Sequence, residues 1–319
     1  MFKDRQQLRK DYVYDISALL AYLVLAIVVL RGLLFRSGTL GHLWDWSIPP
    51  TANDLAHMAR GALFVWSSQW FGSYASYSTS ILPFQVVIGS VGFIGFSGEF
   101  VSKFLVVVTI VVAGFSMYKL VKDIIIKDID GHGTAFHTGG IEAILVEFSS
   151  LIAGYAYALS PYVFNEINGG AYTQFFAVAV IPLVIFCYRR TTSDNSLKWK
   201  VSTAIMLTAV SMASAKMILV FLILGMYALY KGKKGVLALS HVAILWFPMN
   251  AYWIMPMLCT MDVLEKAFFT SKQLSDMFRN LEYISPNMAQ ALRGTGYWGS
   301  GINSFFERSI VSSPMYSIW

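Results

Sequence analysis

Residues 101 to 127 read VSKFLVVVTIVVAGFSMYKLVKDIIIK, an apolar run of membrane-spanning length that ends in lysines. The apolar part, residues 101 to 118, suits a helix crossing a hydrocarbon core about 30 Å thick. Lys119, Lys122 and Lys127 follow it directly. Because short segments rich in Lys and Arg stay on the cytoplasmic side of a membrane, this stretch predicts a helix that ends in the cytoplasm.

Three further clusters of basic residues also lie next to apolar segments. They comprise Lys3, Arg5, Arg9 and Lys10; Arg189, Arg190, Lys198 and Lys200; and Lys231, Lys233 and Lys234. Together the four clusters occupy every second gap between the apolar segments. This alternation predicts a multi-spanning chain whose N terminus and basic gaps are cytoplasmic.

Seven apolar segments are expected to cross the membrane as helices. They are residues 16 to 35, 101 to 118, 141 to 159, 173 to 188, 201 to 215, 217 to 230 and 236 to 258. The first segment lacks a small-residue cleavage site, and it is too long for a signal-peptide core, so we interpret it as an anchor. The fold class expected is an all-α, polytopic helical bundle in the cell membrane, with an extracytoplasmic C terminus.

The composition supports lipid as the solvent of this chain. Hydrophobic residues make up 56% of the sequence and charged residues 13%, and the mean hydropathy is +0.57. The net charge of +6 arises mainly from the basic clusters, which would attract anionic headgroups, so no nucleic-acid partner is expected. Cys187 and Cys259 fall on opposite expected faces and form no metal-ligand spacing, so neither a disulfide nor a metal site is predicted.

One apolar segment is not expected to cross. Residues 81 to 97, ILPFQVVIGSVGFIGFS, carry Pro83, Gly89, Gly92 and Gly95. A full crossing would also move the lysine cluster that follows residue 118 to the outside. We therefore predict a membrane-dipping or protein-buried segment on the outer side.

Residues 53 to 66 are predicted to form an amphipathic helix along the outer surface, with Asn53 as its N-cap. Its apolar face would carry Leu55, Met58, Ala59, Ala62 and Val65. His57 and Arg60 would lie on the other face, where they could bind a phosphate group. An ordinary solvated polar face is the alternative.

The outer loop of residues 36 to 80 contains the strongest candidate for a catalytic base. Asp45 lies between Trp44 and Trp46, and indole rings favour the membrane interface. A carboxylate partly desolvated there could accept a proton from a sugar hydroxyl. The alternative is that Asp45 only caps a turn before the two prolines that follow.

Other outer positions could bind substrate. Asn165 and Glu166 are expected in a tight turn, Lys216 at the tip of a short helical hairpin, and Arg293 with Trp298 in the motif QALRGTGYW. A Lys or Arg at the outer leaflet can stabilise a leaving phosphate, although a single cation at a helix end often only reaches for water. On the cytoplasmic side, Glu142 and Glu147 could relay protons or, as we favour, bond neighbouring helices.

Several stretches together resemble one family of enzymes. They are WDW, ILPFQVVIG, SSLIAGYAYALSPYVF, SMASAKMILV, PMNAYWIMP and QALRGTGYW. In this order they are similar to the N-terminal half of the large actinobacterial α-(1→3)-arabinofuranosyltransferases, membrane enzymes of the GT-C class. The resemblance extends from about residue 16 to about residue 300.

The resemblance implies a glycosyltransferase that moves a sugar from a polyprenyl-phosphate donor to a glycan or lipid acceptor on the extracytoplasmic face. Asp45 falls on the family's acidic position, so it would be the base of an inverting transfer. Arg60, Lys216, Arg293 or a divalent cation would meet the phosphate charge. A non-catalytic membrane protein, such as a lipid-sugar transporter or a scaffold subunit, is the alternative.

The resemblance also implies a division of the chain. Residues 1 to 258 would form the GT-C-like transmembrane domain. Residues 259 to 319 would be an extracytoplasmic segment, the start of a region that continues in the longer family members.

Overall fold

The computed structural model describes residues 2 to 40, 48 to 63, 66 to 67, 73 to 74, 79 to 131, 141 to 169, 172 to 212 and 214 to 268. Within these ranges the chain is helical except for turns, short connections and one pair of two-residue strands. β1 (Trp66–Ser67) and β2 (Ser73–Tyr74) pair antiparallel. The expected all-α polytopic bundle is confirmed.

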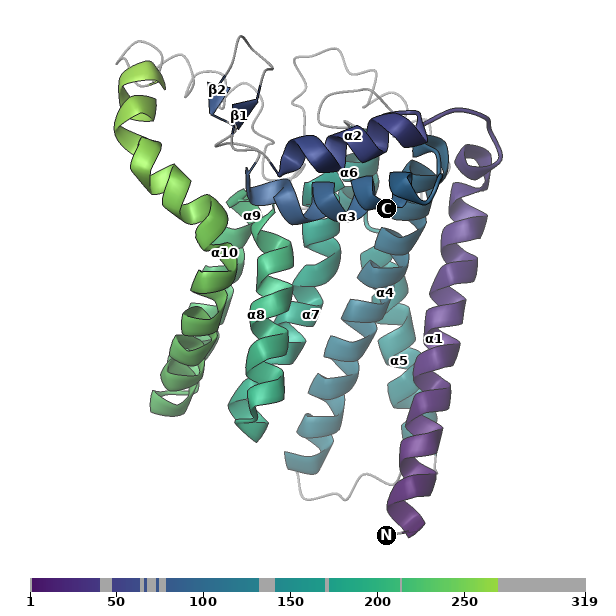
Figure 1. Ribbon diagram of the computed structural model, residues 1–319. Helices are drawn as coiled ribbons and strands as arrows, with labels where there is room; N and C mark the ends of the chain where they lie inside the picture. Colours follow the sequence, from purple (N-terminus) through teal and green to yellow (C-terminus); the bar gives the residue numbers. More distant parts are fainter. Residues whose placement is uncertain are drawn as a thin grey trace.

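The long helices lie side by side and form the body of the protein (Figure 1). They are α1 (Phe2–Leu34), α4 (Gly98–Gly131), α5 (Ile141–Ala158), α7 (Tyr172–Asp194), α8 (Leu197–Ser211), α9 (Ser214–Tyr230) and α10 (Lys233–Phe268). Five of the helical segments described are long and apolar enough to span a membrane, in α1, α4, α5, α7 and α10. The chain is a multi-pass membrane protein.

The remaining two predicted spans are shorter than expected for a full crossing. Helix α8 has 15 residues and helix α9 has 17, which correspond to about 22 and 25 Å of helix. Two residues, Met212 and Ala213, separate the two helices in the sequence. Their closeness agrees with the tight hairpin that the small residues of SMASAK predict.

The bundle has two distinct ends. At one end lie three short helices, α2 (Ala52–Ala62), α3 (Leu82–Phe93) and α6 (Pro161–Gly169), and we call this the α2–α3 end (Figure 1). At the opposite end α1 begins, α4 ends, and the turns between α7 and α8 and between α9 and α10 lie. The four basic clusters belong to this opposite end, which we call the Lys/Arg end.

Helix α3 confirms that residues 81 to 97 do not cross the membrane. It has 12 residues, about 18 Å of helix, and lies beside α2 across the end of the bundle (Figure 1). Despite its proline and glycines, the segment forms a regular helix from Leu82 to Phe93. Pro83 lies in its first turn, and Gly95 follows its end with a φ of +93°, a conformation that favours glycine.

The two glycines in the middle of α3 permit close contact with α2. A Cβ on Gly89 would lie 2.6 Å from Cβ of Ala59, and a Cβ on Gly92 would lie 2.4 Å from the carbonyl oxygen of Ala52. These separations are shorter than atoms tolerate. Small residues on both helices therefore allow the two backbones to approach, as they do between membrane helices.

The amphipathic helix is shorter than predicted, and its cap differs. The observed N-cap is Thr51, whose hydroxyl accepts a hydrogen bond from the backbone N–H of Asp54 at 3.1 Å. Asn53, the predicted cap, lies within the first helical turn and is exposed. Thr51 takes the role because its extended backbone places its hydroxyl over the first turn. On the buried face lie Leu55, Ala56 and Ala59.

Tyr22 packs α1 against α4 and α5 in the middle of the bundle. Its ring is fully buried, and its hydroxyl donates to the carbonyl oxygen of Leu151 at 3.0 Å. A Cβ on Gly114 would lie 2.5 Å from the Tyr22 ring, and one on Gly154 would lie 2.0 Å from its hydroxyl oxygen. The three helices approach closely because glycines accept this aromatic side chain.

Candidate functional site

The predicted site residues fall into three groups in the structure. Asp45, Arg293 and Trp298 lie outside the described residues. Asn165 in α6 and Lys216 in α9 have a described backbone, but their side chains lie outside the description. His57 and Arg60 on α2, together with Glu166 on α6, are described in full.

The start of α4 holds the chain on both sides of residues 41 to 47. On the N-terminal side, the backbone N–H of Leu40 donates to the hydroxyl of Ser102 at 3.2 Å. On the C-terminal side, the backbone N–H of Gly98 donates to the carbonyl oxygen of Pro50 at 2.9 Å. A Cβ on Gly98 would lie only 1.8 Å from the carbonyl oxygen of Pro49, so only glycine permits this contact.

Ile48 strengthens the C-terminal attachment. Its side chain is 3% exposed and belongs to the apolar core that includes Leu55, Val101 and Val163. Burial of a whole Ile side chain stabilises its position by roughly 1.5 to 3 kcal/mol. The residues flanking the 41 to 47 segment are therefore fixed to the folded end of the bundle.

The exposed face of α2 carries His57 and Arg60, one helical turn apart. The guanidinium of Arg60 lies 5.3 Å from the centre of the Phe93 ring on α3, a geometry typical of a cation–π contact. His57 is exposed to solvent. Both side chains are accessible to a ligand at the α2–α3 end. The same exposure also fits an ordinary solvated polar face.

Glu166 lies in a helix rather than in the predicted tight turn. Helix α6 begins at Pro161, which suits a first helical position, and the Ser160 hydroxyl accepts from the Val163 backbone N–H at 3.4 Å. These signals start a helix at Pro161, although Gly169 and Gly170 follow nearby in the sequence and favour a turn. Glu166 is fully buried, whereas the sequence suggested an accessible side chain.

A cation that the sequence did not single out lies beside the anchored segment. The ammonium of Lys103 is 2.6 Å from the Glu99 carboxylate and also donates to the carbonyl oxygen of Arg36. The spacing of four residues between Glu99 and Lys103 is the signal that could have found this pair. The pair with Glu99 lies within α4, and the contact with Arg36 ties the chain just after α1 to the first turns of α4.

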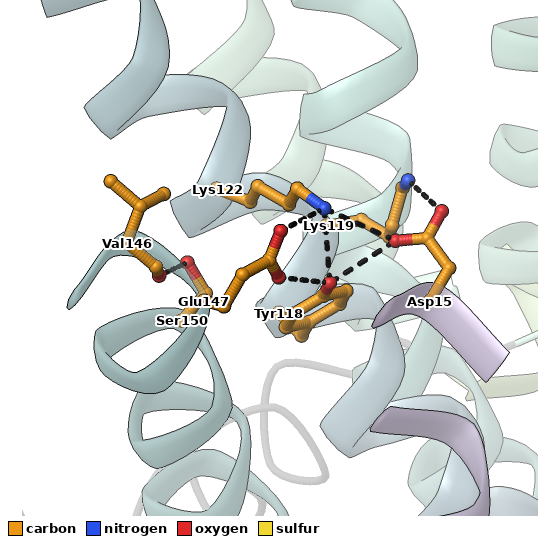
Figure 2. A network of polar contacts seen from close by, with 7 residues as sticks. All are labelled: Asp15, Tyr118, Lys119, Lys122, Val146, Glu147 and Ser150. Carbon is orange, nitrogen blue, oxygen red and sulfur yellow. Dashed lines mark hydrogen bonds and ion pairs between the residues drawn. The ribbon is translucent and has the colours of Figure 1, made fainter. Parts of the chain in front are cut away.

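Charged residues at the Lys/Arg end form a partly buried network across three helices (Figure 2). The ammonium of Lys122 lies 2.6 Å from Glu147 and 3.5 Å from Asp15, while Lys119 lies 2.7 Å from Asp15. The Tyr118 hydroxyl donates to Glu147 at 2.5 Å. This network joins α1, α4 and α5, and it confirms that Glu147 bonds a neighbouring helix; Glu142 is exposed.

A second buried polar group, which sequence reasoning missed, joins α8 to α10. Asn250 is fully buried, and its amide donates to the Thr208 hydroxyl at 2.9 Å. Its carbonyl oxygen accepts from the Ser211 hydroxyl at 2.8 Å and from the Trp253 indole at 2.9 Å. Since these bonds satisfy the amide, the group is suited to holding the two helices in register.

The described part of the chain contains no group of three or more His, Cys, Asp or Glu side chains that could hold a metal ion. No protein-family model matches the chain, and comparisons with curated proteins and with solved structures gave no significant match. The resemblance to arabinofuranosyltransferases therefore stays a prediction.

Proposed function

We propose that the protein is a membrane glycosyltransferase of the GT-C class, which transfers a sugar from a polyprenyl-phosphate donor to a glycan or lipid acceptor on the extracytoplasmic face. The observation that carries the proposal is the attachment of the chain to α4 on both sides of the segment containing Asp45. A catalytic base has to be held near its substrate, and a segment anchored at both ends meets that requirement.

The attachment of the flanking residues to α4 limits how far Asp45 can lie from the bundle. Asp45 precedes the buried Ile48 by three positions, and three residues of extended chain span at most about 11 Å. The exposed face of α2 belongs to the same end of the bundle (Figure 1). This arrangement supports a site between the Asp45 segment and α2.

The proposed reaction is a single inverting displacement. Asp45 takes the proton from an acceptor hydroxyl, whose oxygen forms a bond to the anomeric carbon of the donor sugar. The bond between that carbon and the phosphate oxygen breaks, and the polyprenyl phosphate leaves as an anion. Arg60 on α2 and Lys216 in the first turn of α9 are the cations proposed to stabilise this charge.

The leaving group determines which catalytic groups the site needs. A phosphate departs as a stable anion without being protonated, so no general acid is required. This distinguishes the proposed site from the paired carboxylates of glycoside hydrolysis. One carboxylate and nearby cations are sufficient.

Replacement of Asp45 tests the proposal. Asp45→Asn removes the base while preserving size, so transfer from a lipid-linked sugar should fall by roughly 10²-fold or more, with donor binding little changed. Asp54→Asn is the matched control, because Asp54 is exposed and interacts with the Thr51 cap; it should cost at most a few-fold. A folded Asp45→Asn protein with full activity would eliminate the mechanism.

The alternative is a non-catalytic protein, a lipid-sugar transporter or a scaffold subunit. The partly buried network of Asp15, Lys122 and Glu147 would suit a transporter if it moved protons instead of only joining helices, because ionisable residues within a membrane often mark transport pathways. Binding of donor without turnover by the purified protein would support this alternative. Loss of turnover in Asp45→Asn would exclude it.

A further inference from the structure

Asp123 on α4 attracts three cations at the Lys/Arg end. Its carboxylate side chain is 1% exposed. Nε of Arg189 lies 3.1 Å from one carboxylate oxygen, and Nε of Arg190 lies 2.9 Å from the other. The ammonium of Lys127, one turn further along α4, lies 3.6 Å away. We call these four residues the Asp123 cluster.

The Asp123 cluster carries more positive charge than its carboxylate can neutralise. Three cations face one anion, which leaves an excess of two positive charges. Among the described side chains, the exposed Asp194 on α7 could compensate one of these two positive charges. By contrast, the neighbouring network of Figure 2 contains two lysines and two carboxylates, so it is balanced.

The arginine side chains remain able to bind a further anion. In both ion pairs the guanidinium atom nearest Asp123 is Nε, so the terminal NH₂ groups are not the atoms that Asp123 holds. A guanidinium can bind a phosphate through two parallel N–H groups. The side chains of Arg190 and Lys127 are 35% and 32% exposed, so a ligand can reach them.

Aromatic rings orient the two guanidinium groups. Arg189 lies 5.9 Å from the centre of the Tyr227 ring, and Arg190 lies 5.6 Å from that of Phe186. Lys231, in the turn between α9 and α10, lies 5.6 Å from the Tyr227 ring. Such contacts restrict side-chain motion before a ligand binds, which lowers the entropic cost of binding.

The cluster also lies at the ends of two candidate membrane spans, where lipid headgroups are expected. Lys127 ends one candidate membrane span, and Arg189 and Arg190 lie in the last turns of another. Close by, Leu229 and Tyr230 at the end of α9 are largely exposed, as expected of side chains that contact acyl chains. Basic sites between membrane helices bind anionic lipid headgroups in this setting.

We propose that the Asp123 cluster is a binding site for the phosphate group of an anionic lipid. Arg189 and Arg190 bind the phosphate through their terminal NH₂ groups, and Lys127 adds charge from α4. Asp123 holds the cations together, and the acyl chains extend along α9. This site is distinct from the proposed catalytic site, which lies at the opposite end of the bundle.

Binding of defined lipids to the purified full chain tests the proposal. Native mass spectrometry in detergent would measure dissociation constants for phosphatidylglycerol and for phosphatidylcholine with the same acyl chains. Each arginine near the headgroup contributes about fivefold in affinity, so Arg189→Gln/Arg190→Gln should weaken phosphatidylglycerol binding by roughly 25-fold. Phosphatidylcholine carries the same phosphate, but its choline ammonium is repelled by the cations, so it should bind more weakly to the wild type and lose less affinity in the variant.

The matched control removes equal charge from the same end. Lys233 and Lys234 are exposed and lie outside the cluster, so Lys233→Gln/Lys234→Gln should keep the preference for phosphatidylglycerol. An equal loss in this control would mean diffuse attraction only and would overturn the proposal. Competition by inorganic phosphate as strong as that by phosphatidylglycerol would overturn the lipid assignment.

A second variant covers the case in which the glutamine variant does not fold. Arg189→Lys/Arg190→Lys retains the ion pairs with Asp123 but lacks the paired NH₂ groups. The purified variant should be monodisperse and helical. It should bind phosphatidylglycerol several-fold more weakly than the wild type. Unchanged binding by this variant would contradict the proposed mode of recognition.

Discussion

The two ends of the bundle are held together by different interactions. At the α2–α3 end, Gly89 and Gly92 bring two helix backbones into direct contact with few charges between them. At the Lys/Arg end, the helices are joined through ion pairs centred on Lys122 and Asp123. Helix α4 takes part in both ends (Figure 1).

This difference separates steric from electrostatic stabilisation. Close packing of small residues depends on shape, so a single added methyl group disturbs it. Partly buried ion pairs depend on the balance of charge, so loss of one partner leaves the other uncompensated. The effect of a substitution should therefore depend on side-chain volume at the α2–α3 end and on charge at the Lys/Arg end.

The largest expected effect concerns which end faces the cytoplasm. In a parent lacking the exposed Cys259 thiol, Ser37→Cys at the α2–α3 end should react with an impermeant thiol reagent in intact cells. Ser196→Cys in the turn between α7 and α8 should react only after permeabilisation. The reverse pattern would invert the orientation and remove the proposed site from the outer face.

Removal of a buried ionic partner should give the largest loss of stability. Glu147→Ala leaves Lys122, whose side chain is 10% exposed, with the longer ion pair to Asp15 and a hydrogen bond to the Tyr118 hydroxyl. We expect a loss of about 1 to 3 kcal/mol in the free energy of unfolding, because Lys122 keeps two weaker partners; denaturant titration in mixed micelles would measure it. Glu142→Ala, at an exposed position of the same helix, should stay within about 0.5 kcal/mol.

A methyl group at the α2–α3 contact should have a similar or smaller effect. Gly92→Ala places a Cβ 2.4 Å from the carbonyl oxygen of Ala52, so α2 and α3 must separate. We expect a cost of about 1 to 3 kcal/mol, the same at low and high salt. Gly61→Ala, where no atom lies within 4 Å, should be neutral or slightly stabilising in the same thermal unfolding assay.

The smallest effect should distinguish the observed cap of α2 from the predicted one. Thr51→Ala removes the hydroxyl that accepts from the Asp54 backbone N–H, which should cost about 1 kcal/mol. Asn53→Ala should change the stability by less than about 0.5 kcal/mol, since Asn53 is exposed in the first turn. The opposite ranking in thermal unfolding would show that Asn53 is the cap.

Hydrophobic runs and clustered charge were sufficient to predict the helical bundle, because both signals are local in the chain. Membrane helices need about 20 apolar residues whatever their neighbours, and each basic cluster lies next to the span it terminates. The same information predicted that residues 81 to 97 do not cross. It could not predict that Gly89 and Gly92 contact α2, since that depends on how two helices rotate against each other.

The partners of charged residues were decided only by the tertiary structure. Nothing near Glu147 in the sequence indicates Lys122 or Asp15, because these residues come from different helices, and the rotation of each helix determines which side chains meet. The burial of Glu166 and the convergence of Arg189 and Arg190 on Asp123 follow in the same way. Periodicity along one helix determines that helix, whereas the packing of several helices determines a site.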